Sequence, residues 1–446
     1  MSDSGFSYSF DQIKQMSEDV LKVAKRLGAS SAEAELSLSI GQNVSVRMGE
    51  VENIEYNRDK GMSVTVYFGK QKGHASTSDM SPQALADTVA AACNIAKYTA
   101  QDEFCGLADP ELMATDIQDL DLHHPWDISV DEAIEIARIC EAAALGVDSR
   151  ITNSEGASVS TGTGFFAYSN SHGFTGGYSS SRHGVSCSVI AESGGSMQRD
   201  YWYSTARAAE DLQSAADIGT VAGERTVRRL NAKKIKTCQV PVLFEAPLAS
   251  GLISTLISAI SGGNLYRKSS FLLDSLGKQI ASPLLNIYED PFIKKGLASS
   301  PFDNEGVATK ARQLVQDGVL QGYVLSSYSA RKLGMKTTGN AGGNHNLMIR
   351  PGANDFAGLL KQMGTGLVVT ELLGHGMNMV TGDYSRGAAG FWVENGMIVH
   401  PVEEITIASN MVDMLKMITA IGNDVLVQGS KQVGSILIER MTVAAD

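Results

Sequence analysis

The sequence has few of the features that stabilise small secreted proteins. Only five cysteines occur in 446 residues, and they are Cys93, Cys105, Cys140, Cys187 and Cys238. No two of them form a Cys-x-x-Cys pair, and none follows Cys238. This pattern supports neither a disulfide framework nor a zinc knuckle, and it is typical of a reducing compartment. We therefore expect a cytoplasmic protein.

Long apolar segments are also scarce. Residues 1–10 include an acid but no apolar run, so we expect no signal peptide. Residues 246–266 carry no charge, but serine, threonine and glycine interrupt them repeatedly. Such a stretch favours a buried helix over a membrane span, and we expect no membrane partner.

Positive charge is in deficit. The 37 lysines and arginines face 49 aspartates and glutamates, which gives a formal net charge of −12. A surface of this sign repels phosphate backbones, so we expect no direct contact with nucleic acid. Cations near the end of a helix complement its dipole, and we interpret the densest basic group as a solvated helix end. This group comprises Arg225, Arg228, Arg229, Lys233, Lys234 and Lys236.

Glycine, in contrast, is abundant, with 45 residues concentrated in the middle and the C-terminal half. This favours tight turns and sheets over helix bundles. Apolar residues have helical spacing at 13–27 and then alternate with period two at 32–48 and 64–68. Ser81-Pro82 and Ser129 are predicted to begin further helices. The fold class that follows is α+β.

The chain, at 446 residues, is too long to fold around one compact core, so we predict two or three domains. We place an α/β N-terminal domain at 1–105, an α/β middle domain at 120–232 and a β-rich C-terminal domain at 238–446. The first two units have a similar order of elements. Their side chains do not repeat, so we infer no duplication.

Motifs of hydrolytic enzymes are missing. There is no His-Glu-x-x-His, and neither Gly-x-Ser-x-Gly nor Ser-x-x-Lys occurs in a strand–turn–helix context. Glu371 and His375 are four residues apart and would share one face of a helix. Their neighbours have the pattern of a strand, and Gly374 and Gly376 flank the histidine. We therefore interpret the spacing as coincidental.

The segment from His375 to Gly387 combines frequent glycines with polar side chains. Beyond it, Asn395-Gly396 predicts a hairpin turn between residues 391 and 399. One interpretation is a glycine-rich hairpin with a long polar loop, in which the polar groups hold the turns together. The other is a cleft wall that binds an extended peptide or a partner. The candidate substrate or partner residues are His375, Asn378, Thr381, Asp383, Tyr384, Ser385 and Arg386.

In the segment from His375 to Gly387, the chain resembles the TldD/PmbA family of peptidases, and its PmbA (TldE) branch in particular. The resemblance extends from the first helix to the last strand. It implies the family's α/β N-terminal domain, α/β middle domain and β-rich C-terminal domain. Several landmarks occur in the family's order, namely Gly49-Glu50-Val51-Glu52-Asn53, Arg150-Ile151-Thr152-Asn153-Ser154-Glu155-Gly156, Tyr266-Arg267-Lys268-Ser269 and Ser300-Pro301-Phe302-Asp303-Asn304-Glu305-Gly306.

The catalytic TldD branch carries His-Glu-x-x-x-His at a fixed distance before an Arg-Lys pair. Counting back from Arg267 places Ser254, Thr255 and Ala259 at these positions. A hydroxyl and a methyl group are poor zinc ligands, and threonine cannot act as the carboxylate base. The family's further ligand is a C-terminal cysteine, and none follows Cys238. The resemblance thus implies no catalytic residue and no metal in this chain. We expect the helix around Ser254 to be a packed core element and not an open site.

The implied function is that of a non-catalytic subunit in a cytosolic metallopeptidase complex. A TldD-like partner would supply zinc, and this chain would complete the cavity for small unfolded or modified peptides, such as a microcin precursor or an antitoxin. One alternative is an independent hydrolase with an unrecognised nucleophile or a metal at Glu371, His375 or Asp383. Another is a scaffold or regulator linked to DNA gyrase. The peptide substrate, the stoichiometry and a homodimer of the isolated chain stay open.

Overall fold

The computed structural model describes residues 8–445 of the chain. Most of the segment on which we expected no signal peptide lies outside this range. Between residues 8 and 445, no helix is long and apolar enough to cross a membrane. The predicted α+β class is confirmed, since the structure combines helices with three sheets.

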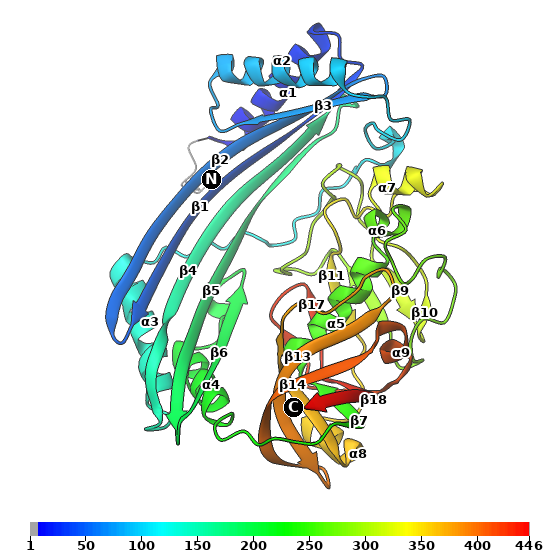
Figure 1. The fold of residues 1–446 in the computed structure, drawn as a ribbon. Coiled ribbons are helices and arrows are strands. Elements are labelled where there is room, and N and C mark those ends of the chain that lie inside the picture. The colour runs from blue at the N-terminus through cyan, green and yellow to red at the C-terminus, as the bar shows by residue number, and fades with distance from the viewer. Residues whose placement is uncertain (1–7, 446) are drawn as a thin grey trace.

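The N-terminal part of the chain builds one long, curved antiparallel sheet with the strand order β3-β2-β1-β4-β5-β6 (Figure 1). β1 pairs with β4 from Glu33 opposite Asn170 to Val46 opposite Ala157. The strands of the first two predicted domains therefore form a single sheet, which the sequence pattern did not indicate. Its strands are β1 (Ser31–Arg47), β2 (Glu50–Phe68), β3 (Gln71–Thr77), β4 (Ile151–Asn170), β5 (Thr175–Ser193) and β6 (Ser196–Ala206).

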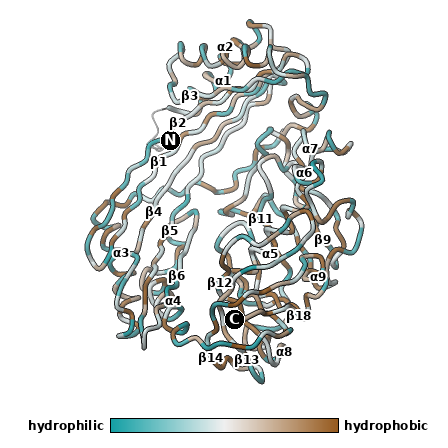
Figure 2. Tube along the Cα trace, viewed as in Figure 1, coloured by the Kyte–Doolittle hydropathy of each residue, from teal (hydrophilic) through white to brown (hydrophobic). Residues whose placement is uncertain are grey.

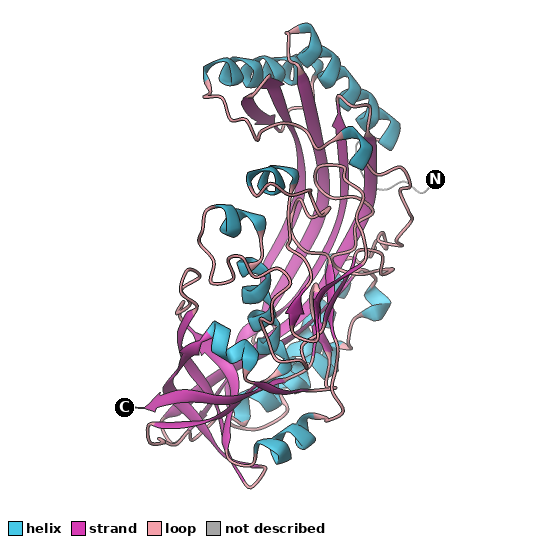
Figure 3. Cartoon of the chain, turned by 90° about the vertical axis from the view of Figure 1, so that its right-hand side faces the viewer, coloured by secondary structure: helices cyan, strands magenta, loops and turns pink. Residues whose placement is uncertain are grey.

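Four helices cover one face of this sheet, and Figure 3 shows the long strands with helices at both ends. On β1, Ala34 and Leu36 pack in the cluster of the first two helices, whereas Val44 and Val46 pack with the third. Residues separated by an even number of positions share one face of a strand, so all four point the same way. The helices are α1 (Phe10–Arg26), α2 (Pro82–Tyr98), α3 (Val130–Leu145) and α4 (Ala215–Val227), with short 3₁₀ turns at Pro110–Leu112 and Ala209–Asp211.

The helix starts follow local sequence signals as predicted. Ser81 accepts a hydrogen bond from the backbone N–H of Ala84 at the start of α2, with Pro82 in the first turn. Ser129 forms a capping box with Glu132 at the start of α3. Both caps satisfy backbone N–H groups that have no partner within the helix.

The C-terminal part contains two further sheets, with the orders β10-β9-β8-β11-β17-β16 and β14-β13-β12-β7-β18-β15. β14 also pairs with β18, so the strands β14, β13, β12, β7 and β18 close into a barrel. The first of these sheets comprises β8 (Ile287–Asp290), β9 (Arg312–Gln316), β10 (Val319–Leu320), β11 (Asn346–Ile349), β16 (Leu426–Val427) and β17 (Lys431–Val433). The second comprises β7 (Cys238–Phe244), β12 (Gly366–Leu373), β13 (Asp383–Glu394), β14 (Met397–Asn410), β15 (Ile418–Ile421) and β18 (Ile436–Ala445).

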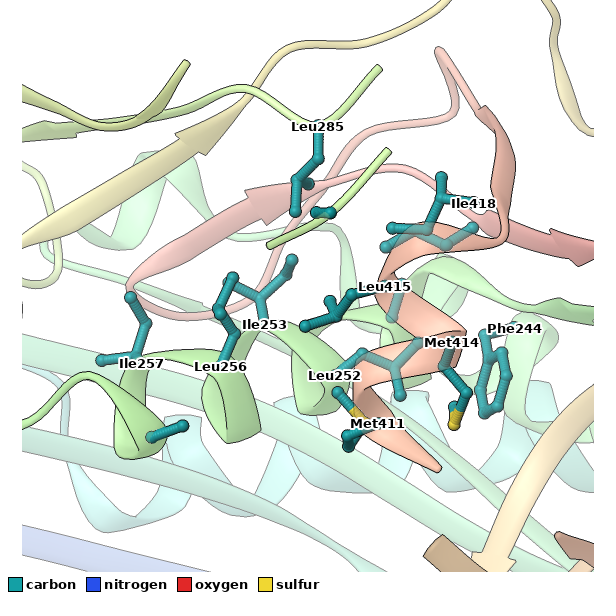
Figure 4. Packing of buried hydrophobic residues seen from close by; sticks show 14 of the residues in the cluster. Phe244, Leu252, Ile253, Leu256, Ile257, Leu285, Met411, Met414, Leu415 and Ile418 are labelled. Carbon is teal, nitrogen blue, oxygen red and sulfur yellow. The ribbon is translucent and has the colours of Figure 1, made fainter. Parts of the chain in front are cut away.

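The uncharged segment predicted to be a buried helix is α5 (Ala246–Ala259), which lies at the centre of the C-terminal core. Figure 4 shows Leu252, Ile253, Leu256 and Ile257 on one side of this helix, packed toward neighbouring elements. Hydrophobic residues are concentrated in this part of the molecule, whereas the long strands of the first sheet are paler in Figure 2. Shorter helices complete it, namely α6 (Gly262–Tyr266), α7 (Ser327–Lys332), α8 (Phe356–Met363) and α9 (Met411–Lys416).

The predicted hairpin is confirmed between β13 and β14. Asn395 and Gly396 connect the two strands, and both have positive φ angles, of 53° and 74°. A two-residue turn of this kind requires positive φ at both positions, which Asn-Gly adopts at little cost.

Candidate functional site

A polar cavity of about 290 Å³ lies along β6, the last strand of the first sheet, where this strand approaches the C-terminal part. Because β6 is an edge strand, no neighbouring strand covers this side of it. The cavity brings together segments far apart in the sequence. Its lining comes from β6 (199–203), α4 (Arg225), the turn after α4 (Arg229), the start of α5 (Pro247 and Leu248), β12 (370–372) and Gln428.

Buried ion pairs connect α4 to the walls of this cavity. Arg225 Nη1 lies 3.0 Å from Glu245 Oε2, and its Nε lies 3.4 Å from Asp200 Oδ1. Arg229 pairs with Glu371 of β12, and its Nη1 lies 3.8 Å from Asp200 Oδ2. The interpretation of this basic group as a solvated helix end is therefore wrong for these two arginines, whose side chains are each only 10% exposed. They face carboxylates across a domain junction and not solvent.

Ser254 of α5 lines a second, smaller cavity of about 110 Å³. The two cavities share Tyr203, Pro247 and Gln428 as lining residues. Lys431 lines the smaller one, and burial lowers the pKa of its ammonium group. The expectation of a packed helix without a site is thus only half right. One face of α5 forms the core, while the face with Ser254 lines a cavity.

The residues that the resemblance implies at the metal positions do not fit a zinc ion. Ser254 Oγ donates to the backbone carbonyl of Ser250 at 2.9 Å, and Thr255 Oγ1 donates to that of Gly251 at 3.1 Å. Ala259 is fully buried and offers only a methyl group. Throughout residues 8–445, no group of three or more His, Cys, Asp or Glu side chains is arranged to hold a metal ion.

The polar segment from His375 to Arg386 lies elsewhere, and none of its residues lines either cavity. Asn378 accepts hydrogen bonds from the N–H groups of Val380 and Thr381. Asp383 accepts from Thr381 Oγ1 at 2.6 Å, and Arg386 Nη2 donates to the carbonyl of Gly374 at 2.6 Å. These contacts are the ones expected if the polar groups hold the loop together.

The electrostatics of this segment agree with a local role. A hydrogen bond from the Thr381 hydroxyl, followed by one from Asn410, lowers the pKa of the Asp383 carboxyl. Tyr384 is buried, which raises its pKa to about 12. His375 and Ser385 are exposed. Binding of a peptide or a partner by this loop stays a prediction.

The strand predicted around Glu371 is confirmed. Glu371 lies in strand β12, and His375 follows the end of that strand. The two residues therefore do not share a helix face. The carboxylate of Glu371 instead pairs with Arg229, which follows the end of α4.

Several residues of the cavity gave no signal in the sequence. Asp200 and Thr370 line it, and Glu245 pairs with Arg225 beside it, yet the three are far apart in the chain and no spacing connects them. The arginine-rich end of α4 was visible as a pattern. Its function as an ion-paired junction depends on tertiary contacts that local periodicity does not encode.

Family models of the PmbA/TldA metallopeptidases match the chain at residues 32–96 (domain 1), 123–230 (central domain) and 237–445 (C-terminal domain). The chain is 51% identical over 434 residues to the metalloprotease PmbA of Escherichia coli O157:H7, covering 97% of this chain and 96% of that protein. It is 48% identical over 436 residues to the PmbA homologue of Haemophilus influenzae, covering 98% of this chain and 96% of that protein.

Two solved structures show the same fold. A proposed modulator of DNA gyrase from Bacteroides thetaiotaomicron superimposes with a TM-score of 0.93 at 29% identity, covering 98% of this chain and 100% of that one. TldE from Thermococcus kodakarensis superimposes with a TM-score of 0.85 at 20% identity, covering 96% and 100%. From its domains and its close relatives, the chain belongs to the PmbA/TldD metallopeptidase family.

Proposed function

We propose that this chain is a non-catalytic subunit of a PmbA/TldD-type metallopeptidase complex. The observation that carries the proposal is the chemistry of α5 at the family's metal positions. Ser254 and Thr255 use their hydroxyls within the helix, and Ala259 has no donor atom. Zinc sites in hydrolases need nitrogen, sulfur or carboxylate ligands, and a carboxylate or comparable base to activate water.

The partner in this proposal is a TldD-like subunit that holds the zinc ion. When bound there, zinc would polarise the scissile carbonyl and activate water. This chain would contribute the wall of a shared substrate cavity and bind small, unfolded or modified peptides in a cytosolic complex. The cavity between β6 and α5 supports this role, because it retains an accessible polar lining although the ligand positions are replaced.

The proposal is tested by reconstitution with a TldD-like relative from the same organism. We expect no cleavage of an unfolded peptide by this chain alone and rapid cleavage by the mixture. A mixture in which the partner's metal-binding histidines are replaced serves as the matched control and should be inactive. Cleavage by this chain alone would favour an independent hydrolase. Equal cleavage by the partner with and without this chain would favour a scaffold or regulator.

A further inference from the structure

A groove of about 970 Å³ lies between α1 and α2, at the end of the first sheet that is remote from β6 and α4 (Figure 1). Val20, Met80 and Leu85 form its floor and are only 2%, 4% and 7% exposed. These three residues belong to the apolar cluster that packs both helices on the sheet. The groove therefore continues this part of the core to the surface. Its other apolar lining residues are Met16, Val23, Pro82 and Ala86.

The charged residues that line this groove are mostly basic. They are Lys22, Lys25 and Arg26, together with one acid, Asp19. Asp19 pairs with Lys22 at 3.2 Å, whereas neither Lys25 nor Arg26 forms an ion pair within residues 8–445. Both lie in the last turn of α1 and are exposed, and cations there complement the helix dipole. Their charges nevertheless stay open to a partner, on a chain whose net charge is −12.

The walls of the groove limit the kind of backbone that can occupy it. Along α1 and α2 the N–H and C=O groups bond within each helix, so the walls offer no strand edge to an extended peptide. A helix satisfies its own backbone groups and can place one apolar face into such a groove. Met16 and Met80 are flexible side chains that adapt to the shape of a partner. The groove therefore favours a helix with an apolar stripe.

The charges at the rim select one kind of amphipathic helix. Acidic residues beside the apolar stripe would lie against Lys25 and Arg26, whereas a basic helix would be repelled there. A net charge of −12 opposes approach to an anionic membrane surface, so a lipid occupant is disfavoured. We propose that the groove between α1 and α2 binds an acidic amphipathic helix of another protein. This inference does not depend on the proposed function.

Three labelled peptides test the groove without any variant of the chain. The first is a helix of about five turns with leucine at every third or fourth position and glutamate and alanine elsewhere. The second replaces each glutamate by lysine, and the third has the composition of the first in scrambled order. Titrated into the full chain and followed by fluorescence anisotropy, both should bind at least about tenfold more weakly than the first. Equal affinity for all three, or no binding of the first, would overturn the inference.

Variants of the chain locate the binding. Ala86→Glu places a carboxylate in the groove and should weaken binding of the acidic peptide at least about tenfold, because like charges then meet. Ala91→Glu adds the same group at an exposed position of α2 outside the groove and should leave the affinity unchanged. Reversing Lys25 and Arg26 to glutamate should weaken binding about three- to tenfold and reduce its dependence on salt. Lys14→Glu, exposed on α1 outside the groove, is the matched control.

Melting temperatures confirm that each variant is folded, and unchanged peptide affinity in a folded Ala86→Glu chain would contradict the inference. Three other occupants of the groove give different results, and each would also overturn it. A dimer of the chain that Ala86→Glu dissociates would place a second copy there. Binding to vesicles of phosphatidylserine and phosphatidylcholine that Ala86→Glu abolishes would place a lipid surface there. Tighter peptide binding after deletion of residues 2–7 would assign the groove to that segment.

Discussion

Replacing Arg225 by alanine should lower the free energy of unfolding by about 3 kcal/mol, because it removes the most buried of the cations that face the carboxylates of Asp200 and Glu245 and leaves them only Arg229 and Arg228. The Arg225 side chain is 10% exposed, and its partners Asp200 and Glu245 are 5% and 14% exposed. Removal of the guanidinium also eliminates its contact with the Trp202 ring. Chemical denaturation followed by tryptophan fluorescence measures the effect.

An exposed ion pair provides the control for this variant. Lys22 pairs with Asp19 on α1 at 3.2 Å, and the two side chains are 63% and 58% exposed. Lys22→Ala should change stability by less than about 0.5 kcal/mol, since exposed pairs contribute little. If Arg225→Ala were as mild as this control, the ion pairs at the junction would not stabilise the fold.

Leu256→Ala should cost about 2–5 kcal/mol through lost burial and the cavity left behind. Leu256 is fully buried on α5, within the largest apolar cluster of the C-terminal part. Figure 4 shows it beside Leu252 and Ile253, at the packed face of the helix. The measurement is the same denaturation experiment.

Leu284 offers a matched control, because it is 49% exposed. Leu284→Ala should change stability by no more than about 0.5 kcal/mol. An effect of Leu256→Ala within that same range would indicate that α5 is not a core element. Burial of the helix would then no longer explain why residues 246–266 carry no charge.

Local features of the fold could be predicted from the sequence because neighbouring residues determine them. The caps at Ser81 and Ser129 and the turn at Asn395-Gly396 each depend on a few adjacent positions. The pairing of β1 with β4 could not be predicted in the same way. It sets Val44 opposite Val159 across more than a hundred residues, and alternation shows that a strand exists but not its neighbour.

The candidate site also has parts that the sequence could predict and parts that it could not. Ser254, Thr255 and Ala259 could be selected as candidate replaced ligand positions because each is a single residue in a family pattern, and that assignment stays a prediction. The cavity could not, since its lining residues Asp200 and Thr370 come together only after β6 and β12 have packed. Tertiary contacts also place Arg225 and Arg229, at the basic end of α4, in ion pairs with Glu245 and Glu371 and not on a solvated surface.

Zinc content is the most direct measure of the central claim, that this chain acts without a metal of its own. Elemental analysis would follow dialysis without chelator, on the purified chain and on its complex with a TldD-like subunit. We predict about one zinc per TldD-like subunit in the complex and no stoichiometric zinc in the chain alone. About one tightly held zinc per copy of the isolated chain would contradict the account.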